Sequence, residues 1–270
     1  MKTTTLFSGF CLLLLFTANQ SCADMLDSWH WRNPSPFANS LRCVCFGADK
    51  FVAVGDGGMI HTSPDGTTWD DGRRVVTSTL WKVVYANGQF IAVGNDGVIV
   101  TSADGFSWTN QVSGTSNALY AVAYGNGKYV ACGQSGQLTV SSNGTTWLPG
   151  NAGTNTNDFS WIAFGNGTFV LPGNQPMTVL VSSDAQSWSS MTFPNAQRHV
   201  WPHRLYQAEY GNGVFVAAVV DEVWVPNEKN WDAGEHFYQS TDGTNWIQGT
   251  GYRAGAGIIN WDTASRVCLL

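Results

Sequence analysis

The sequence predicts an all-β protein, and more narrowly a β-propeller with six blades of about 40 residues. Three observations support this prediction. One phrase recurs five times, each copy contains four short strand-like runs, and each copy ends in a Ser-x-Asp-Gly-x-x-Trp segment or a close variant of it. The aromatic residues that open the copies are spaced by about 40 residues, which is the period of a propeller blade. These residues are Phe46, Tyr85, Tyr124, Phe164 and Tyr210.

The composition excludes several other classes of protein. Charged residues make up 12% of the 270 residues, whereas soluble domains usually have ~25%. Lys, Glu, Leu and Ala are too scarce for a helical bundle, and an aromatic content of 13% is too high for a disordered chain. The net charge of −6 argues against a nucleic-acid surface, which needs clustered cations to displace counterions.

The second copy illustrates how each unit divides into strands A to D. Strand A ends at Tyr85, and Asn87-Gly88 then forms a tight hairpin turn, because both residue types tolerate positive φ. Strand B is the apolar run that begins at Phe90, and strand C is the run 97–101. An Asp-Gly turn follows, and Trp108 opens strand D.

The Ser-x-Asp-Gly-x-x-Trp segments, which we call the Asp turns, are expected to have a structural role. The carboxylate is expected to accept hydrogen bonds from backbone N–H groups of its own turn, and the Trp to pack between neighbouring sheets. The residues concerned are Asp65, Asp104, Asn143, Asp184 and Asp242, followed by Trp69, Trp108, Trp147, Trp188 and Trp246.

The Asp turns resemble the Asp-box of the BNR repeat, which occurs in sialidases and in many non-enzymatic secreted propellers. The motif in this chain is one residue shorter than the usual Ser-x-Asp-x-Gly-x-Thr-Trp. At the level of the fold, the resemblance covers nearly all of residues 29–270. It implies a propeller whose Asp-boxes lie at the blade periphery and take no part in catalysis, and it says little about activity.

The N-terminal segment predicts a secreted protein. Lys2 is followed by a short apolar run, Phe10–Phe16, and Ser21-Cys22-Ala23 provides small residues for cleavage. We interpret residues 1–23 as a signal peptide; an uncleaved membrane anchor is the alternative. Residues 24–270 are then one propeller domain without a membrane span, secreted or held at the cell surface or in the periplasm.

The two ends of the chain are expected to build the sixth blade together. Residues 28–33 are typical of a strand D, while residues 257–261 and 266–270 are typical of strands A and B. Closing the ring in this way would cover an exposed strand edge. The alternative is that the chain is a truncated form of a longer, seven-bladed propeller.

The four cysteines that follow the predicted signal peptide leave two interpretations open. Cys43 and Cys45 alternate with Val44 and therefore share one face of the sheet. One of them could pair with Cys268 and join the chain ends, or these cysteines and Cys132 could be small buried residues at tight sheet interfaces. The sequence does not decide the pairing.

Two insertions interrupt the repeat near the fifth copy. From Trp188 to Tyr210 there are 22 residues, against 16 from Trp108 to Tyr124, and the segment from strand B to the Asp turn is also longer. In an up-and-down blade, the D–A and B–C connections leave from the same end, so the insertions 189–205 and 219–236 are expected to meet on one face. The candidate ligand-binding residues there are Arg198, His199, Trp201, His203, Arg204, Asp221, Glu222, Trp224, Trp231, Asp232 and His236.

Glutamate is confined to the same region. Glu209 occupies a position that is small and apolar in the other copies, so we expect it to find a partner such as Arg204 or a histidine, or to have a shifted pKa. The four glutamates all fall within 27 residues: Glu209, Glu222, Glu228 and Glu235.

These observations predict a secreted, monomeric, non-enzymatic propeller that binds a glycan or an extracellular protein through the face formed by the two insertions. Insertions that merely cover the surface, and a scaffold for protein assembly, are alternatives. A sialidase-like glycoside hydrolase using Glu209, Glu222 and Glu235 is another, although the Arg-Ile-Pro motif of sialidases is missing. No cofactor is expected and no metal, because Pro202 interrupts the pair His199 and His203.

Overall fold

A computed structural model describes residues 40–153, 157–173, 178–194, 204–225, 230–248 and 253–254. For residues 204–206, 219–225, 230–236 and 253–254 only the backbone is described. All of these residues belong to one compact unit, 39–270. The predicted signal peptide and the predicted sixth-blade strands 28–33 and 257–270 lie outside the described residues.

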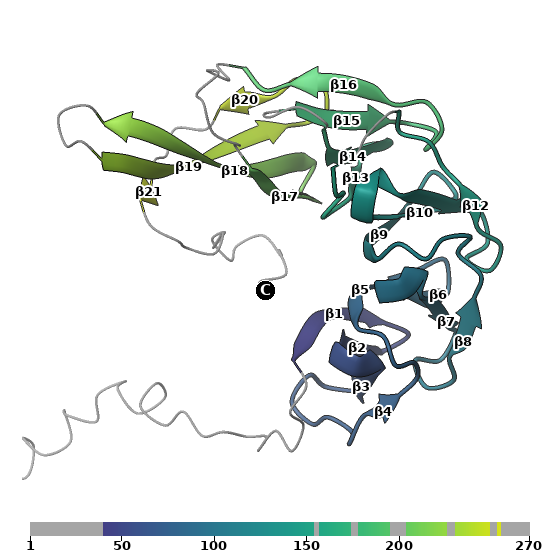
Figure 1. The fold of residues 1–270 in the computed structure, drawn as a ribbon. Coiled ribbons are helices and arrows are strands. Elements are labelled where there is room, and N and C mark those ends of the chain that lie inside the picture. Colours follow the sequence, from purple (N-terminus) through teal and green to yellow (C-terminus); the bar gives the residue numbers. More distant parts are fainter. Residues whose placement is uncertain are drawn as a thin grey trace, which may run out of the picture. The chain divides into compact units, whose positions relative to one another are not determined.

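The fold is a β-propeller, as the sequence predicts. Five antiparallel sheets follow one another along the chain, and in each of them the four main strands pair in chain order (Figure 1). Blades 1 and 2 consist of β1 (Leu41–Gly47), β2 (Lys50–Gly55), β3 (Met59–Ser63), β4 (Arg73–Arg74), β5 (Leu80–Ala86), β6 (Gln89–Gly94), β7 (Ile99–Ser102) and β8 (Thr109–Gln111).

The other three blades repeat this plan, and the fifth adds one strand, β21, beside β19. Blades 3 and 4 consist of β9 (Leu119–Gly125), β10 (Lys128–Gly133), β11 (Leu138–Ser141), β12 (Leu148–Pro149), β13 (Ala163–Gly165), β14 (Thr168–Pro172), β15 (Thr178–Ser182) and β16 (Ser189–Thr192). Blade 5 consists of β17 (Arg204–Gly211), β18 (Val214–Val225), β19 (Asn230–Ser240), β20 (Ile247–Gln248) and β21 (Arg253–Ala254).

The core lies between successive sheets. In blade 3, Tyr124, Tyr129 and Trp147 form a stack with ring centroids 4.5 and 6.4 Å apart, and this stack packs against Val84 and Ile91 of blade 2. Similar clusters fill the other three seams between the described sheets. The recurring aromatic residues therefore hold each blade to the one before it, and aromatic stacking adds to the burial of apolar surface.

Hydrogen bonds at one end of the sheets join neighbouring blades. The first residue of strand B reaches a main-chain carbonyl in the Asp turn of the next blade. Lys50 Nζ donates to the carbonyl of Asp104, and Gln89 Nε2 to that of Asn143, each at 2.8 Å. Lys128 Nζ does the same with the carbonyl of Asp184, also at 2.8 Å. In the fourth seam, Asn166 Nδ2 donates to the carbonyl of Thr241 at 3.1 Å.

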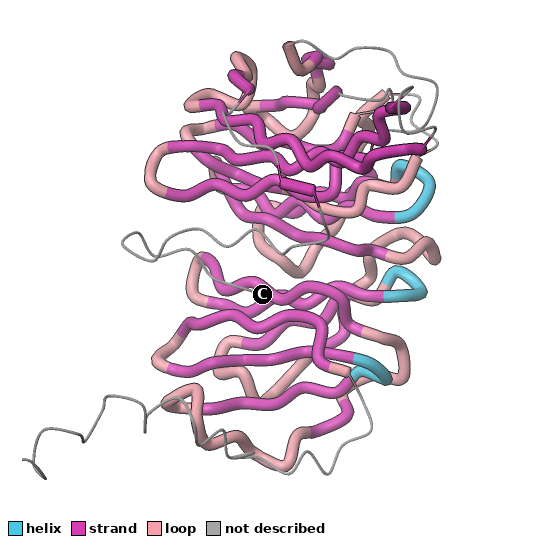
Figure 2. The backbone as a smooth tube through the Cα atoms, turned by 90° about the vertical axis from the view of Figure 1, so that its left-hand side faces the viewer, coloured by secondary structure: helices cyan, strands magenta, loops and turns pink. Residues whose placement is uncertain are grey.

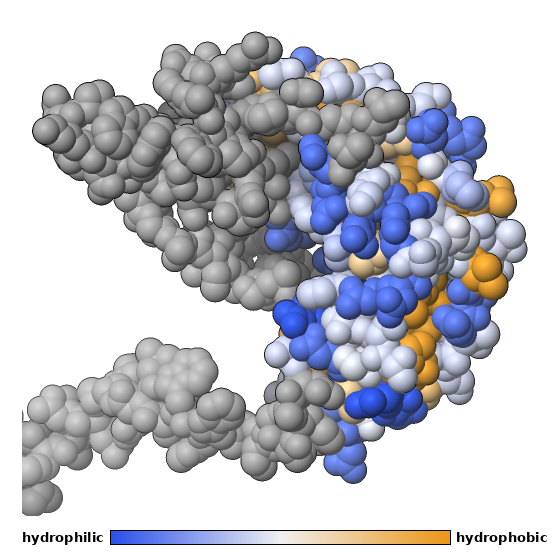
Figure 3. Space-filling view, in the orientation of Figure 1, coloured by the Kyte–Doolittle hydropathy of each residue, from blue (hydrophilic) through white to orange (hydrophobic). Residues whose placement is uncertain are grey.

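The outermost strands are short. β4, β12 and β20 have two residues each, and β8 has three. Short edge strands offer few unpaired backbone groups to another chain, which protects the sheet edge from aggregation. Apolar and polar surface alternate over the described part of the molecule (Figure 3), and Val112, Leu148 and Ile247 are exposed apolar side chains on or beside these strands.

Three of the four cysteines that follow the predicted signal peptide lie in the described part of the chain, and Cys43 and Cys132 are free thiols. Cys43 and Cys45 both pack in the core between blades 1 and 2, so they share one face of β1, as their alternation predicts. Cys132 is fully buried between blades 3 and 4. This placement agrees with small residues at tight sheet interfaces. Cys268, the partner considered for a disulfide, lies outside the described residues.

Candidate functional site

The Asp turns share one pattern of hydrogen bonds to the side chain of their Asp or Asn. In blade 2, Asp104 Oδ1 accepts from the backbone N–H of Phe106 and of Ser107, at 2.8 and 2.7 Å. The indole N–H of Trp108 donates to the carbonyl of Gly105 at 3.0 Å. The N–H groups of Ser107 and Phe106 hold the pKa of Asp104 well below its usual range. The carboxylate is therefore engaged by its own turn, which is a structural role.

In blades 1–3, the B–C turn and the D–A connection meet at the opposite end of the sheet. The N–H of Asp56 donates to the carbonyl of Ser40, that of Asn95 to Thr79, and that of Gln134 to Ala118, at 2.8–2.9 Å. The B–C turns are the short 3₁₀ turns η1 (Asp56–Gly58), η2 (Asn95–Gly97) and η3 (Gln134–Gly136), which lie on the same side of the molecule in Figure 2.

Blade 5 departs from this plan for a reason visible in its sequence. Strand B of blades 1–3 ends in Gly, because a Cβ at Gly94 would lie 2.1 Å from the carbonyl oxygen of Thr79. The turn then requires a left-handed Gly, for which Gly97 with φ +67° is the example. Val219 and Val220 follow the apolar run in blade 5 instead. Both are β-branched residues that favour extended backbone, so the strand continues.

The insertion 219–236, which the sequence placed in a connecting B–C loop, is therefore not a loop. β18 runs on to Val225 and β19 begins at Asn230, so most of the insertion extends the sheet as a β-hairpin. β17 pairs with β18 only as far as Val220, and β21 pairs with β19 at Gly234 and Glu235. Residues 221–225 and 230–233, which we call the hairpin end, extend past both neighbouring strands (Figure 1).

Several predicted binding residues lie at the hairpin end. Trp224 is paired in register with Trp231, and Val223 with Asp232. Asp221 and Glu222 occupy the preceding positions of β18.

Two further candidates lie at the base of the hairpin, and four are outside the described residues. Arg204 opens β17 opposite Val220, and His236 is opposite Val219. The structure thus brings together the half of the predicted site that comes from the B–C insertion. Residues 195–203 of the D–A insertion are not described, and they include Arg198, His199, Trp201 and His203.

Glu209 does not occupy a buried site. Its side chain is exposed, and Oε1 accepts a hydrogen bond from Gln207 Nε2 at 2.7 Å, a partner that the sequence did not suggest. The equivalent Ala163 of blade 4 is buried because blade 5 covers it. No described residue covers the corresponding face of blade 5, so Glu209 can remain hydrated there.

Glu222 and Glu235, two of the glutamates that the glycoside hydrolase alternative would use, are not paired with each other in the hairpin. Glu222 is paired with Ala233, and Glu235 with Val220. Among the residues with described side chains, no group of three or more His, Cys, Asp or Glu is placed to hold a metal ion.

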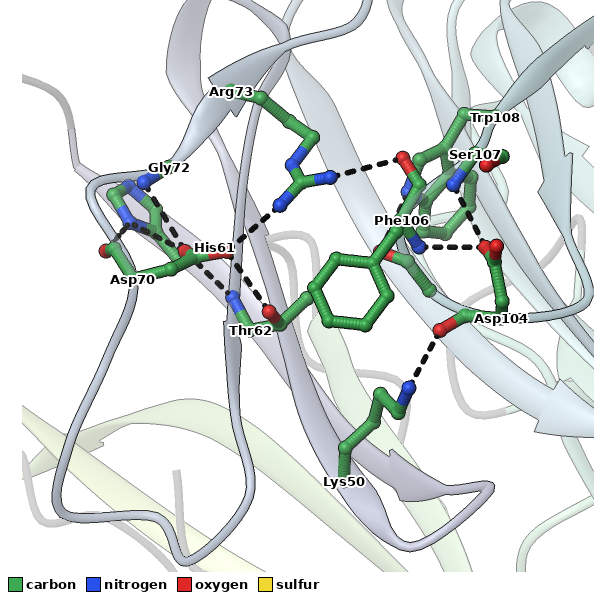
Figure 4. A network of polar contacts seen from close by, with 11 residues as sticks. Lys50, His61, Thr62, Asp70, Gly72, Arg73, Asp104, Phe106, Ser107 and Trp108 are labelled. Carbon is green, nitrogen blue, oxygen red and sulfur yellow. Dashed lines mark hydrogen bonds and ion pairs between the residues drawn. The ribbon is translucent and has the colours of Figure 1, made fainter.

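A polar cluster at the seam of blades 1 and 2 was missed by the sequence reasoning (Figure 4). Arg73 donates to Asp70 Oδ2 at 3.1 Å and to the carbonyl of Phe106 at 3.2 Å. The Phe106 ring lies between two cations, with Lys50 Nζ 4.4 Å and Arg73 Cζ 4.8 Å from its centroid. The signal was the Asp-Asp-Gly-Arg-Arg run at 70–74, together with a Phe at a position that is Thr in three other copies.

Asp70 is the centre of this cluster. It accepts hydrogen bonds from the backbone and hydroxyl groups of Thr62, each at 2.9 Å, and from the N–H of Gly72 at 3.1 Å. Partial burial would raise the pKa of Asp70, but the hydrogen bonds from Thr62, Arg73 and Gly72 outweigh this effect and lower it. Its carbonyl contacts Nδ1 of the buried His61 at 3.2 Å. Arg73 is thus ion-paired with Asp70 in its own blade and hydrogen-bonded to Phe106 of blade 2, so the cluster joins two blades.

None of the described residues forms a helix with the length and apolar character that a membrane span requires.

The comparisons with known proteins agree on the architecture. No family model matches the chain, and no curated protein matches its sequence. Among solved structures, virginiamycin B lyase from Staphylococcus aureus has a TM-score of 0.58 at 10% identity, over 77% of this chain and 83% of that one. YCF48 bound to a D1 peptide gives 0.53 at 14% identity, over 79% and 81%.

A nidogen/laminin complex gives a TM-score of 0.52 at 9% identity, over 73% of this chain and 80% of that one. At such low identities the likeness concerns the backbone and carries no information about activity. The five sheets and these similar structures together establish that the chain is a β-propeller.

Proposed function

We propose that the protein is a secreted, non-enzymatic β-propeller that binds an extracellular protein through the hairpin end of blade 5. The observation that supports this proposal most strongly is the hairpin itself. In blades 1–3, the chain turns back within three residues after strand B. In blade 5, β18 instead continues to Val225, and β19 begins only at Asn230. Segments that extend from a rigid scaffold carry a disproportionate share of the binding residues of proteins.

The composition of the hairpin end supports the same proposal. Trp224 and Trp231 are paired in register at its tip, and Trp is enriched among the residues that contribute most to protein–protein interfaces. Two of the similar structures are complexes, YCF48 with a D1 peptide and nidogen with laminin. They illustrate that a propeller can serve as a protein-binding module.

A glycan is the second candidate ligand. Trp224 and Trp231 are the observation that favours it, because an indole ring provides a large flat apolar face with a polar N–H at its edge. Both ligand classes would use the same hairpin end, so one set of variants tests them together.

The test compares the full chain with a variant whose hairpin is shortened. Val220 and Glu235 are paired in register, so replacing residues 221–234 by Asn-Gly joins them through a two-residue turn. A Val112→Ser variant is the control, because Val112 is 84% exposed and lies in blade 2. Each protein is screened against a displayed random peptide library and a glycan array.

We expect peptides that bind the native chain and the Val112→Ser variant and that fail to bind the shortened hairpin. Glycans with the same dependence would make the ligand a carbohydrate and overturn the choice of a protein partner. Ligands that bind the shortened variant equally well, or none from either library, would overturn the hairpin as the site. Secretion is tested separately by mass spectrometry of the exported protein, which should begin at Asp24.

A further inference from the structure

We infer that Tyr120 and Asp158 form a binding site that takes the guanidinium group of an arginine side chain from a protein partner. Its residues belong to blade 3 and to the connection into blade 4, so the site is separate from the hairpin end and does not rest on the proposed function. It is the open end of a row of contacting side chains that begins at Arg42 and passes through Trp81.

The row is built by a recurring irregularity of strand A. In β1, β5 and β9 the pairing with strand B shifts by one residue, as at a β-bulge, and the residues that are skipped are Arg42, Trp81 and Tyr120. A bulge re-aims the side chain of its extra residue, and bulges are frequent next to active sites. The three strands lie at the inner ends of their sheets (Figure 1), so the re-aimed side chains of neighbouring blades can meet.

The first two members of the row make matching contacts. Arg42 Nε and Nη2 donate to the carboxylate of Asp56 at 2.8 and 3.0 Å, and Arg42 Cζ lies 4.9 Å from the centroid of the Trp81 ring. The indole N–H of Trp81 donates to Asn95 Oδ1 at 2.7 Å, and its ring meets Tyr120 in a T-shaped contact with centroids 6.1 Å apart. The first contact shows how the row holds a guanidinium, over a ring and against a carboxylate.

Tyr120 is the last member of the row. The corresponding residue of blade 4 is Ser160, four positions before the leading aromatic residue, and β13 begins only at Ala163. Ser160 is exposed, and a serine side chain has no ring or guanidinium to stack on its neighbour. Tyr120 is partly exposed. The bulge series of the described strands therefore stops in blade 3, which leaves room for a side chain from another molecule.

A carboxylate lies beside this open end. Asp158 is exposed, and its Oδ1 accepts a hydrogen bond from the N–H of Ser135 at 2.8 Å, which fixes its position. Burial, and then the negative charge of Asp158, raise the pKa of Tyr120, so the carboxylate is close enough to act on the phenol. Among the described residues, no Lys, Arg or His forms an ion pair with Asp158. The ring and the carboxylate thus resemble the surroundings of Arg42, without the cation.

Arginine fits this site better than lysine does. Its guanidinium is planar, stacks on aromatic rings and is more weakly hydrated than an ammonium group. Arg, Trp and Tyr are also the residues that contribute most to protein–protein interfaces. Because Trp81 is already held by its contacts on both sides, the row loses little side-chain freedom when a partner binds.

The experiment is an NMR titration of the isotope-labelled full chain that follows the backbone amide of Ser135, the donor to Asp158. The main probe is the capped peptide Gly-Ser-Arg-Ser-Gly. A second peptide carries citrulline, which has nearly the same shape as arginine without its charge, and a third probe is free L-arginine. The protein variants are Asp158→Asn, which keeps an oxygen for Ser135, and Ser160→Arg, which supplies a guanidinium from the chain itself.

The control variant is Asp49→Asn. It removes the same charge from the A–B turn of blade 1, at a residue with φ +57°, a conformation that Asn tolerates well. We expect the Arg peptide to bind the native chain and Asp49→Asn equally. It should bind Asp158→Asn and Ser160→Arg about tenfold more weakly, because each variant removes or occupies a charge-assisted contact.

The citrulline peptide should leave the Ser135 resonance unchanged. Equal shifts with both peptides would overturn the guanidinium as the ligand. No shift with the Arg peptide, or unchanged affinity in both Asp158→Asn and Ser160→Arg, would overturn the site. Tighter binding of free L-arginine than of the peptide would replace the protein partner by a free amino acid.

Discussion

Tyr85 of β5 lies directly against Gly47, the last residue of β1, so that a Cβ at Gly47 would be 2.0 Å from Cγ of Tyr85. The contact recurs in other seams. Phe164 lies against Gly125, where a Cβ would come within 2.3 Å of the ring. The end of strand A in one blade is thus packed by the leading aromatic residue of the next.

The first prediction is that Gly47→Ala lowers the free energy of unfolding by about 3 kcal/mol, the upper end of the range for overpacked cores. The control is Gly127→Ala, since a Cβ there meets nothing within 4 Å and the residue has φ +73°. It should lose only about 1 kcal/mol from backbone strain. Urea denaturation checks both, and equal losses would mean that the seam opens to accept the methyl group.

The second prediction concerns acid stability. Backbone N–H groups of Ser107 and Phe106 lower the pKa of Asp104, and equivalent donors lower those of Asp65, Asp184 and Asp242. A pKa that is depressed in the folded state contributes stability above about pH 4, the usual Asp pKa, and this contribution is lost as the pH falls further.

Replacing all four aspartates by Asn should therefore flatten the loss of stability between pH 5 and pH 2, as measured by urea unfolding at each pH. Asn143 already forms this turn with an amide oxygen, accepting from Thr145 and Thr146 at 3.0 and 2.9 Å. The converse change, Asn143→Asp, should make the acid limb steeper. An unchanged acid limb in both variants would contradict the prediction.

The third prediction concerns the cation–aromatic contact at the seam of blades 1 and 2. A double-mutant cycle with Arg73→Ala and Phe106→Ala should give a coupling energy of about 0.5–1 kcal/mol, as expected for a partly exposed cation–π pair. The neighbouring Arg74 is exposed, so Arg74→Ala should change the stability little. A coupling energy of zero would show that the two side chains act independently.

The fourth prediction concerns thiol reactivity. Cys132 is fully buried, and burial raises the pKa of its thiol, which leaves almost no thiolate to react. Alkylation with iodoacetamide should leave Cys132 unmodified in the native protein and modify it in urea. Mass spectrometry of tryptic peptides measures this. Fast labelling of Cys132 under native conditions would mean that blades 3 and 4 separate readily.

The fifth prediction tests the sixth blade. The side chain of Phe46, the leading aromatic of blade 1, is 57% exposed, whereas the equivalent residues of the later blades contact a preceding sheet. If the chain ends form a blade over Phe46, then Phe46→Ala should lose about 3 kcal/mol, as for a buried Phe. A loss below about 0.5 kcal/mol, typical of surface positions, would contradict closure over this residue.

The blades and their turns could be predicted because their signals are local. Asn87-Gly88 and the Asp turns fix the backbone within a few residues, and the repeat multiplies each signal. The extended hairpin was misread because a long gap was taken as a loop, although Val219-Val220 in place of a Gly-containing turn indicated a continuing strand. The contact between Arg73 and Phe106 joins residues 33 positions apart on different sheets, and no short-range pattern reports it.

Lys50, Gln89 and Lys128 each donate a hydrogen bond to a main-chain carbonyl of the next blade, a group that every residue carries. These three hydrogen bonds therefore need no particular side chain from the neighbouring blade; only Gln89 adds a bond to a side chain there, the hydroxyl of Tyr129 at 3.2 Å. Gene duplication could insert a further unit of 39 residues, the spacing from Phe46 to Tyr85, without matched substitutions in the flanking units. Recombination between copies is constrained at these three seams mainly by the shape of the aromatic contact.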